Sequence, residues 1–148
     1  MPDDLYDRDF FGWSAEQAAL LERLAAGERV NAAVDWPHIV DEVRDLGKSE
    51  LHQVRSLLRQ AMFHLIKLRA GADRPRSHWR GEVAVFLADA ASRFSPSMRQ
   101  HLDIDDLYGR AAQAARESGA SAPDACPYTL DELLAEQVSV DTLLGKLA

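Results

Sequence analysis

The chain has 148 residues, of which 47% are hydrophobic and 28% charged, and its formal net charge is −7 at pH 7. This composition is that of a globular domain and excludes a disordered or fibrous chain. Its length fits a single domain with one hydrophobic core. No uncharged apolar run approaches the roughly 18 residues that cross a bilayer, so we expect no membrane contact.

The number of cysteines and the charges near the amino terminus indicate the cellular compartment in which the protein is expected. Cys126 is the one cysteine of the chain, so neither an intrachain disulfide nor a cysteine pair for zinc can form. The first nine residues include four aspartates, where a signal peptide would carry basic residues before an apolar run. We therefore expect a cytoplasmic protein without a cofactor.

Charge is sorted along the chain. Residues 1–50 hold 5 basic and 12 acidic residues, residues 51–99 hold 9 and 3, and residues 100–148 hold 3 and 9. A basic middle with acidic ends can neutralise itself on folding, or it can leave a basic surface open to an external anion.

Helix signals begin after an aromatic arm over residues 1–13. A capping box at Ser14 and a stop at Gly27 predict the first helix. A second helix is predicted from Asp35 to Gly47. Its apolar stripe consists of Trp36, Ile39, Val40, Val43 and Leu46. For the tryptophans, Trp13, Trp36 and Trp79, we expect core positions.

A third helix, capped by Ser49 and ending at Arg69 before Gly71, is predicted to be the longest. Apolar residues on opposite sides of its second half predict that it is the central helix of a bundle. Ser77 is the predicted cap of a fourth helix, which Ser95 and Pro96 end.

The last third predicts shorter elements. Asp103 caps a helix that Gly119 ends, and a loop follows over residues 119–128. Thr129 caps a short helix, and residues 136–148 form a tail with a small apolar stripe that needs a surface to pack on. We predict an all-α single domain over residues 1–148, a bundle of about five main helices with a long central helix and a short C-terminal helix.

Six short strings, in one order along the chain, carry a resemblance to a known family. They are Leu5-Tyr6-Asp7-Arg8-Asp9-Phe10 with Trp13, Leu46-Gly47-Lys48-Ser49-Glu50, His64-Leu65-Ile66-Lys67, Ser77-His78-Trp79-Arg80, Ser95-Pro96-Ser97-Met98-Arg99 and Cys126-Pro127-Tyr128-Thr129-Leu130. Over residues 5–135 the chain resembles the bacterial helical family named domain of unknown function 29. The resemblance implies an all-helical bacterial protein and carries over no catalytic role, because the family's name records no activity.

The basic segment, Arg74, Arg76, His78 and Arg80, is the main candidate site. It places cations at a helix start, where the partial positive charge of the helix disfavours them. One interpretation is internal pairing with acids of the first third. The candidate acids are Asp41, Glu42, Asp45 and Glu50. The other interpretation is a site for phosphate or another anion. Internal pairing is the expectation, because segregated charge in a small domain usually pairs internally.

Two histidine-containing patterns have weaker functional interpretations. His38, Asp41 and Asp45 share a helix face as metal ligands would, but no facing pair completes the set, so a solvated acidic face and no metal are expected. His64 is expected to be packed and hydrogen-bonded rather than catalytic.

Residues 46–49 between two predicted helices match a helix-turn-helix. In that motif, the side chains that would contact the DNA bases are Glu50, His52, Gln53, Arg55 and Arg59. The acidic preceding helix argues against it, so no nucleic acid is expected.

No nucleotide-binding, hydrolase or zinc-protease motif is present, so no catalytic residue is named. We favour a noncatalytic interaction module that forms a homodimer, with another protein as the alternative partner. An anion-binding protein or enzyme ranks second, and DNA binding third. Self-association is predicted from surplus apolar residues at both ends. They are Leu5, Tyr6, Phe10, Phe11 and Trp13, and Val140, Leu143, Leu144 and Leu147.

Overall fold

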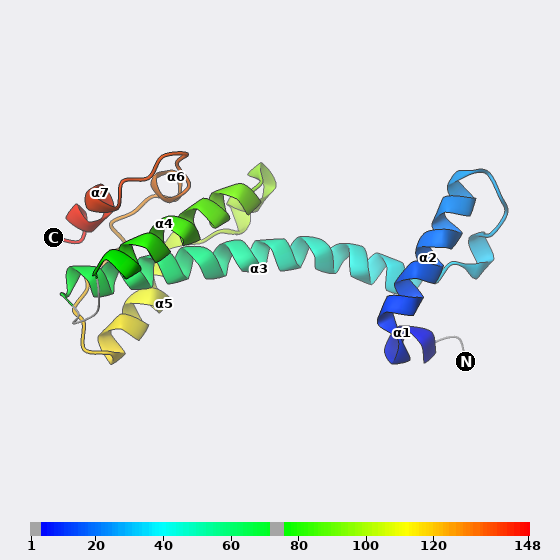
Figure 1. Ribbon diagram of the computed structural model, residues 1–148, viewed down its shortest axis with the longest axis horizontal. Coiled ribbons are helices and arrows are strands. Elements are labelled where there is room, and N and C mark those ends of the chain that lie inside the picture. Colours follow the sequence, from blue (N-terminus) through cyan, green and yellow to red (C-terminus); the bar gives the residue numbers. More distant parts are fainter. Residues whose placement is uncertain (1–3, 72–75) are drawn as a thin grey trace. The chain divides into compact units, whose positions relative to one another are not determined.

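The computed structural model describes residues 4–71 and 76–148, and these residues form helices without a β-strand (Figure 1). The α-helices are α1 (Asp4–Arg8), α2 (Phe10–Ala25), α3 (Trp36–Arg69), α4 (Arg76–Arg93), α5 (Ile104–Glu117), α6 (Leu130–Leu133) and α7 (Val140–Gly145). Two 3₁₀ helices, η1 (Asn31–Ala33) and η2 (Pro96–His101), join them. The all-α prediction is confirmed.

The chain divides into two compact units, Met1–Lys48 and Ser49–Ala148. Helix α3 contributes its first part to the N-terminal unit and its second part to the C-terminal unit. The prediction of a single domain stays a prediction, because two units that share a continuous helix can still fold together.

Helix α3 runs through Gly47 and Ser49, where two separate helices were predicted, so that boundary is wrong. Three other predicted stops, Gly27, Gly71 and Gly119, adopt positive φ and do end helices. Gly47 does not adopt positive φ, and an isolated glycine in a helix costs only about 1 kcal/mol relative to alanine. The helix-turn-helix interpretation is therefore wrong in its geometry, since its turn lies inside a helix.

Side-chain caps locate the helix starts. Asp9 accepts a hydrogen bond from the backbone N–H of Gly12 (2.9 Å), so α2 begins before the predicted cap at Ser14. An aspartate at this position also complements the positive end of the helix. The predicted caps Asp103 and Thr129 are confirmed by bonds to backbone N–H groups in the first turns of α5 and α6.

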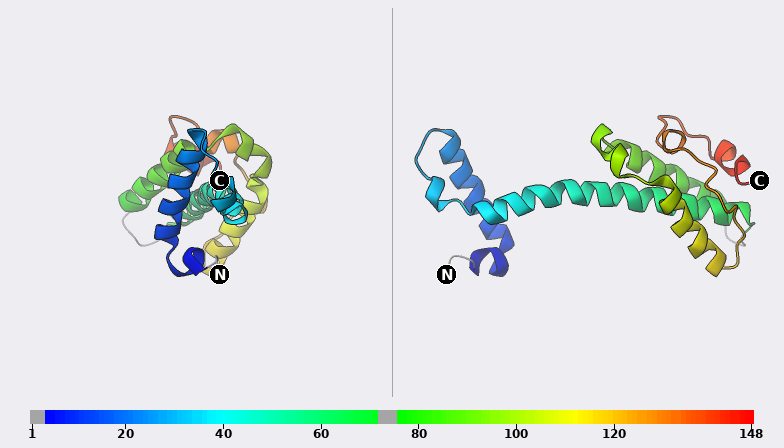
Figure 2. Two further views of the ribbon diagram at one scale, coloured as in Figure 1. Left: turned by 90° about the vertical axis from the view of Figure 1, so that its right-hand side faces the viewer. Right: turned by 180° about the vertical axis from the view of Figure 1, so that it is seen from behind.

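The second half of α3 is the centre of the C-terminal unit, as predicted. Leu58, Leu65, Ile66 and Leu68 are fully buried. At about 100° per residue, Ile66 and Leu68 lie roughly 160° apart around the helix, so the helix is buried on two sides. Their neighbours in the core come from α4, α5 and the segment after α5. Figures 1 and 2 show α4 lying alongside this half of α3.

The C-terminal tail packs on this core. Leu143 and Leu147 are buried. The hydroxyl of Tyr128, itself buried, donates a hydrogen bond to the backbone carbonyl of Leu143 (2.8 Å) and so ties α7 to the segment before α6. The tail stripe is thus covered within the chain, and it does not supply the free surface that was expected there.

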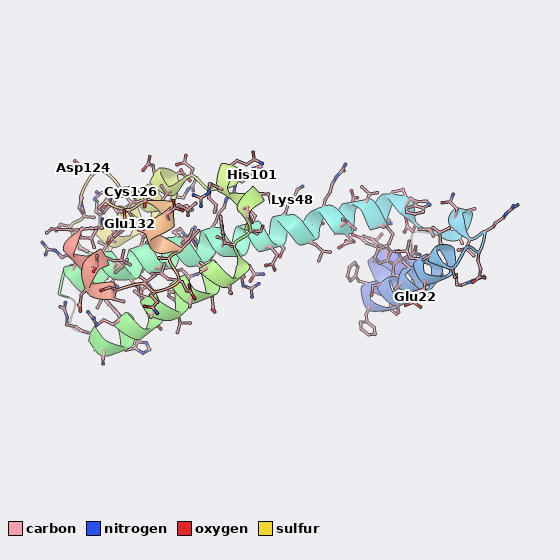
Figure 3. All side chains as sticks on the ribbon, turned by 90° about the horizontal axis from the view of Figure 1, so that it is seen from above. Glu22, Lys48, His101, Asp124, Cys126 and Glu132 are labelled. Carbon is pink, nitrogen blue, oxygen red and sulfur yellow. The ribbon has the colours of Figure 1, made fainter. Side chains whose placement is uncertain are left out.

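Cys126, labelled in Figure 3, lies half-buried just before Pro127. Its Sγ–H donates to the backbone carbonyl of Tyr128 (3.4 Å). Burial raises the pKa of the thiol above its ordinary value of 9.0. The thiol therefore stays protonated at neutral pH.

Candidate functional site

Asp35 organises the N-terminal unit from the residue before α3. Its Oδ2 accepts a hydrogen bond from the indole Nε1 of Trp13 (3.0 Å) and lies 2.7 Å from Nδ1 of His38. Its backbone N–H donates to the side-chain oxygen of Gln17 (2.8 Å). These contacts tie the start of α3 to the middle of α2. They also satisfy the indole N–H of the buried Trp13 and the side-chain oxygen of the buried Gln17.

Tyr6 of α1 covers the same polar side of α3. Its ring stacks on His38 with the centroids 3.7 Å apart, and its hydroxyl donates to the carboxylate of Glu42. That hydrogen bond raises the pKa of Tyr6 to about 12, because ionised tyrosine could not donate to the carboxylate. In the N-terminal unit, the side of α3 that Tyr6 covers is therefore polar rather than apolar.

The predicted apolar stripe of this helix is exposed instead. The exposed fraction is 38% for Trp36, 42% for Val40, 63% for Val43 and 69% for Leu46, while Ile39 is half-buried. At about 100° per residue, Val43 lies roughly 140° around the helix from His38, so packing against His38 leaves it uncovered. We call these five residues the apolar face. The core position expected for Trp36 is wrong.

The N-terminal unit has little core of its own. Among its described residues only Trp13, Gln17 and Val34 are buried. Phe10 and Phe11 of α2 are also exposed, the latter by 84%. A unit of this size ordinarily needs further burial, often from another subunit, to be stable.

The metal candidates do not converge on one point. His38 directs Nδ1 to Asp35, whereas Asp41 and Asp45 are exposed. Over residues 4–71 and 76–148, no group of three His, Cys, Asp or Glu side chains is arranged to hold a metal ion. The acidic face predicted for Asp41 and Asp45 is solvated.

The basic segment pairs within the C-terminal unit where it is described. Nη1 of Arg80 lies 2.9 Å from Asp141, and Nε2 of His78 lies 3.0 Å from Glu82. Arg76 is exposed at the start of α4, which also contains the predicted cap Ser77, and Arg74 lies outside the described residues. These acids differ from the predicted set, whose member Glu50 pairs with Arg93 at 3.1 Å.

His64 is packed, as expected. Its Nδ1 donates to the backbone carbonyl of Gln60 (2.8 Å), and its Nε2 lies 2.9 Å from Glu82. The rings of Trp79 and Phe86 meet it edge-on. The imidazole is thus held on both nitrogens.

The C-terminal unit contains a cleft of basic residues that the sequence analysis did not predict. His52, Arg55 and Arg59 were named there only as DNA-contacting residues of the helix-turn-helix. The cleft is lined by His52, Arg55, Ser56, Arg59, His101, Asp103, Asp106, Leu107 and Arg110. Four of these, His52, Arg55, Ser56 and Arg59, follow the spacing i, i+3, i+4 and i+7. That spacing places them on one face of a helix and could have identified the cleft.

Stability of the N-terminal unit is expected to fall as the pH rises through the pKa of His38. The hydrogen bond to Asp35 raises the pKa of His38 above its ordinary 6.5. Partial burial opposes ionisation of Asp35, but hydrogen bonds from His38 and Trp13 outweigh it and lower that pKa. The stabilisation from protonated His38 is complete below pH 6.5 and is lost as the pH rises through the raised pKa.

Thermal melts from pH 5 to 9 measure this effect. They should show the loss in the wild-type protein and a flatter profile in His38→Gln, because glutamine does not titrate. The variant His52→Gln, changed at an exposed histidine of the other unit, serves as the control. Equal profiles for wild type and His38→Gln would contradict the assignment.

Comparisons with known proteins agree with this fold. The sequence model of the family described as domain of unknown function DUF29 matches residues 5–138. The chain is similar to a crystal structure of an alpha-helical protein of unknown function from Rhodospirillum rubrum ATCC 11170, with 28% sequence identity and a TM-score of 0.72. That match covers 97% of this chain and 97% of the other. No curated protein matches the sequence. In the described part of the chain, no helix is long and apolar enough to cross a membrane.

Proposed function

We propose that this chain, which belongs to the family described as domain of unknown function DUF29, is a noncatalytic helical interaction module that associates with a second copy of itself. The observation that carries the proposal is the apolar face of α3. Its exposed side chains lie next to each other on one helix, in a unit that buries few residues of its own. A contiguous exposed apolar surface of this kind marks a contact site.

A second copy is supported by the spacing of the apolar face. Trp36, Ile39, Val43 and Leu46 are separated by three, four and three residues, so the order of spacings is the same in both directions. An antiparallel copy therefore presents the same spacing to its partner, as a two-fold symmetric contact requires. Trp36 then meets Leu46 of the other copy, and Ile39 meets Val43. A parallel pair would instead oppose the two Trp36 side chains.

The net charge of the N-terminal unit predicts how the dimer depends on salt. Residues 1–48 hold five basic and eleven acidic residues, so two copies repel each other at long range. Salt screens that repulsion and leaves apolar burial almost unchanged. The dimer is therefore expected to strengthen as sodium chloride is raised.

Sedimentation velocity tests the proposal. At tens of micromolar the wild-type chain should be a dimer, and Val43→Glu should weaken the dimer at least about tenfold, because it places a charge in the apolar contact. The matched control is Val85→Glu, which makes the same change at an exposed valine of α4 and should leave the dimer intact. A wild-type monomer, or equal effects of the two variants, would refute the proposal.

Cysteine cross-linking tests the orientation. In a Cys126→Ser background, a mixture of Ile39→Cys and Val43→Cys chains should form a mixed disulfide under mild oxidation. Val43→Cys alone should cross-link poorly. Efficient cross-linking of Val43→Cys with itself would instead indicate parallel helices.

A further inference from the structure

We propose that the basic cleft of the C-terminal unit binds the phosphoryl group of a small organic phosphate ester. The cleft has a volume of about 340 Å³ and is formed by α3, the end of η2 and the start of α5. This volume is within the range of small-ligand sites. It lies in a different unit from the apolar face, so the two proposals are independent.

The cleft carries uncompensated positive charge. Its acids are already engaged, since Asp103 caps α5 and Asp106 lies 2.9 Å from Nε of Arg110. Arg55 donates to the backbone carbonyl of His101 (2.8 Å), which orients its guanidinium without neutralising it. Among the described residues, no carboxylate forms an ion pair with Arg55 or Arg59. Two guanidinium groups one helical turn apart are therefore available to an anion.

The polar neighbours of these arginines suit a phosphoryl group. Ser56 lies between Arg55 and Arg59 on the helix, and the imidazoles of His52 and His101, the latter labelled in Figure 3, also line the cleft. Guanidinium groups bind phosphate oxygens in pairs of charge-assisted hydrogen bonds, and hydroxyl and imidazole N–H groups add single donors. Three arginines against two aspartates leave the lining positive even when both histidines are neutral.

A neighbouring groove extends the site and indicates an ester rather than free phosphate. It has a volume of about 510 Å³ and shares Arg59 and Arg110 with the basic cleft. Beyond these arginines its lining includes the ring of Phe63 and the methyl groups of Ala111 and Ala114. A ligand that places its phosphoryl group beside Arg59 can thus extend an apolar or aromatic group over Phe63.

Calorimetric titration of the full-length protein at low ionic strength tests this proposal, with phenyl phosphate and inorganic phosphate as probes. Phenyl phosphate should bind at one site per chain and more tightly than inorganic phosphate. Arg59→Gln should weaken it at least about tenfold, because the change removes one bidentate donor. Arg110→Gln is a second variant at the junction of the two grooves. Arg29→Gln, at an exposed residue of the N-terminal unit, is the matched control.

The remaining outcomes discriminate between ligand classes. Phe63→Leu should weaken phenyl phosphate and leave inorganic phosphate unchanged; equal affinities of the two probes in the wild-type protein would overturn the ester assignment. Undiminished binding in Arg59→Gln would overturn the site itself. Displacement of phenyl phosphate by a short DNA duplex, lost in Arg59→Gln, would instead assign the cleft to nucleic acid.

Discussion

Replacing Trp13 by alanine should unfold the N-terminal unit. Trp13 is buried, and an alanine in place of a buried tryptophan typically costs about 3–5 kcal/mol. The change also removes the indole N–H that donates to Asp35. Since few other residues of this unit are buried, no remaining core can compensate. Far-UV circular dichroism should show a partial loss of helix, with the C-terminal unit still melting cooperatively.

Two companion variants separate packing from hydrogen bonding at this position. Trp13→Phe keeps an aromatic ring but loses the bond to Asp35, so it should cost about 1 kcal/mol. Phe11→Ala, at a side chain that is 84% exposed, should change the free energy of unfolding by less than about 0.5 kcal/mol. If Trp13→Ala keeps full helix content and stability, Trp13 does not hold this unit together.

Replacing Leu65 by alanine should destabilise the C-terminal unit by about 2–5 kcal/mol. Leu65 is fully buried on α3, in the core shared with α4 and α5. The protein loses the free energy gained by burying the removed methyl groups. The substitution also leaves a cavity, which the side chains around a central helix cannot easily fill. Denaturant unfolding measures the loss.

Val85→Ala is the control for the Leu65 variant. Val85 lies on α4 and is 56% exposed, so its truncation should stay within about 0.5 kcal/mol of the wild type. A loss below about 1 kcal/mol for Leu65→Ala would mean that the second half of α3 is not the centre of this core.

Local signals predicted much of the fold because they act through neighbouring residues. Asp103 and Thr129 cap the helices that the sequence assigns to them, and Gly27 and Gly119 end helices with positive φ. Gly47 carries the same local signal, yet its backbone stays helical. A glycine permits a stop without requiring one, and the sequence analysis did not anticipate that the helical residues on both sides of Gly47 continue as one helix.

Partner choice between helices was harder to predict than the helices themselves. Periodicity identifies the stripe around Val43, but it cannot tell whether another helix of the same chain covers that stripe. In the N-terminal unit, Tyr6 and Trp13 instead cover the polar side, where His38 and Glu42 hydrogen-bond to other residues. These specific polar contacts have no periodic signal in the sequence.

The candidate sites show the same limit. The basic segment, Arg74 to Arg80, was chosen because its basic residues are close in sequence. The described pairs of Arg80 and His78 use Asp141 and Glu82. The basic cleft needs residues from three elements, so only its part on α3 has a recognisable spacing. The two proposed sites lie in different units, and Val43→Glu and Arg59→Gln should therefore have separate effects on association and ligand binding.

The half-buried, protonated thiol of Cys126 provides a kinetic probe of the C-terminal segment. A disulfide reagent such as Ellman's reagent reacts with the thiolate, so modification of the folded chain should be slow and should follow local opening of the segment. Because the chain has one cysteine, the absorbance change reports this position alone. Variants that loosen the packing of Leu143 or Leu147 should therefore accelerate labelling before any change in global melting is detectable.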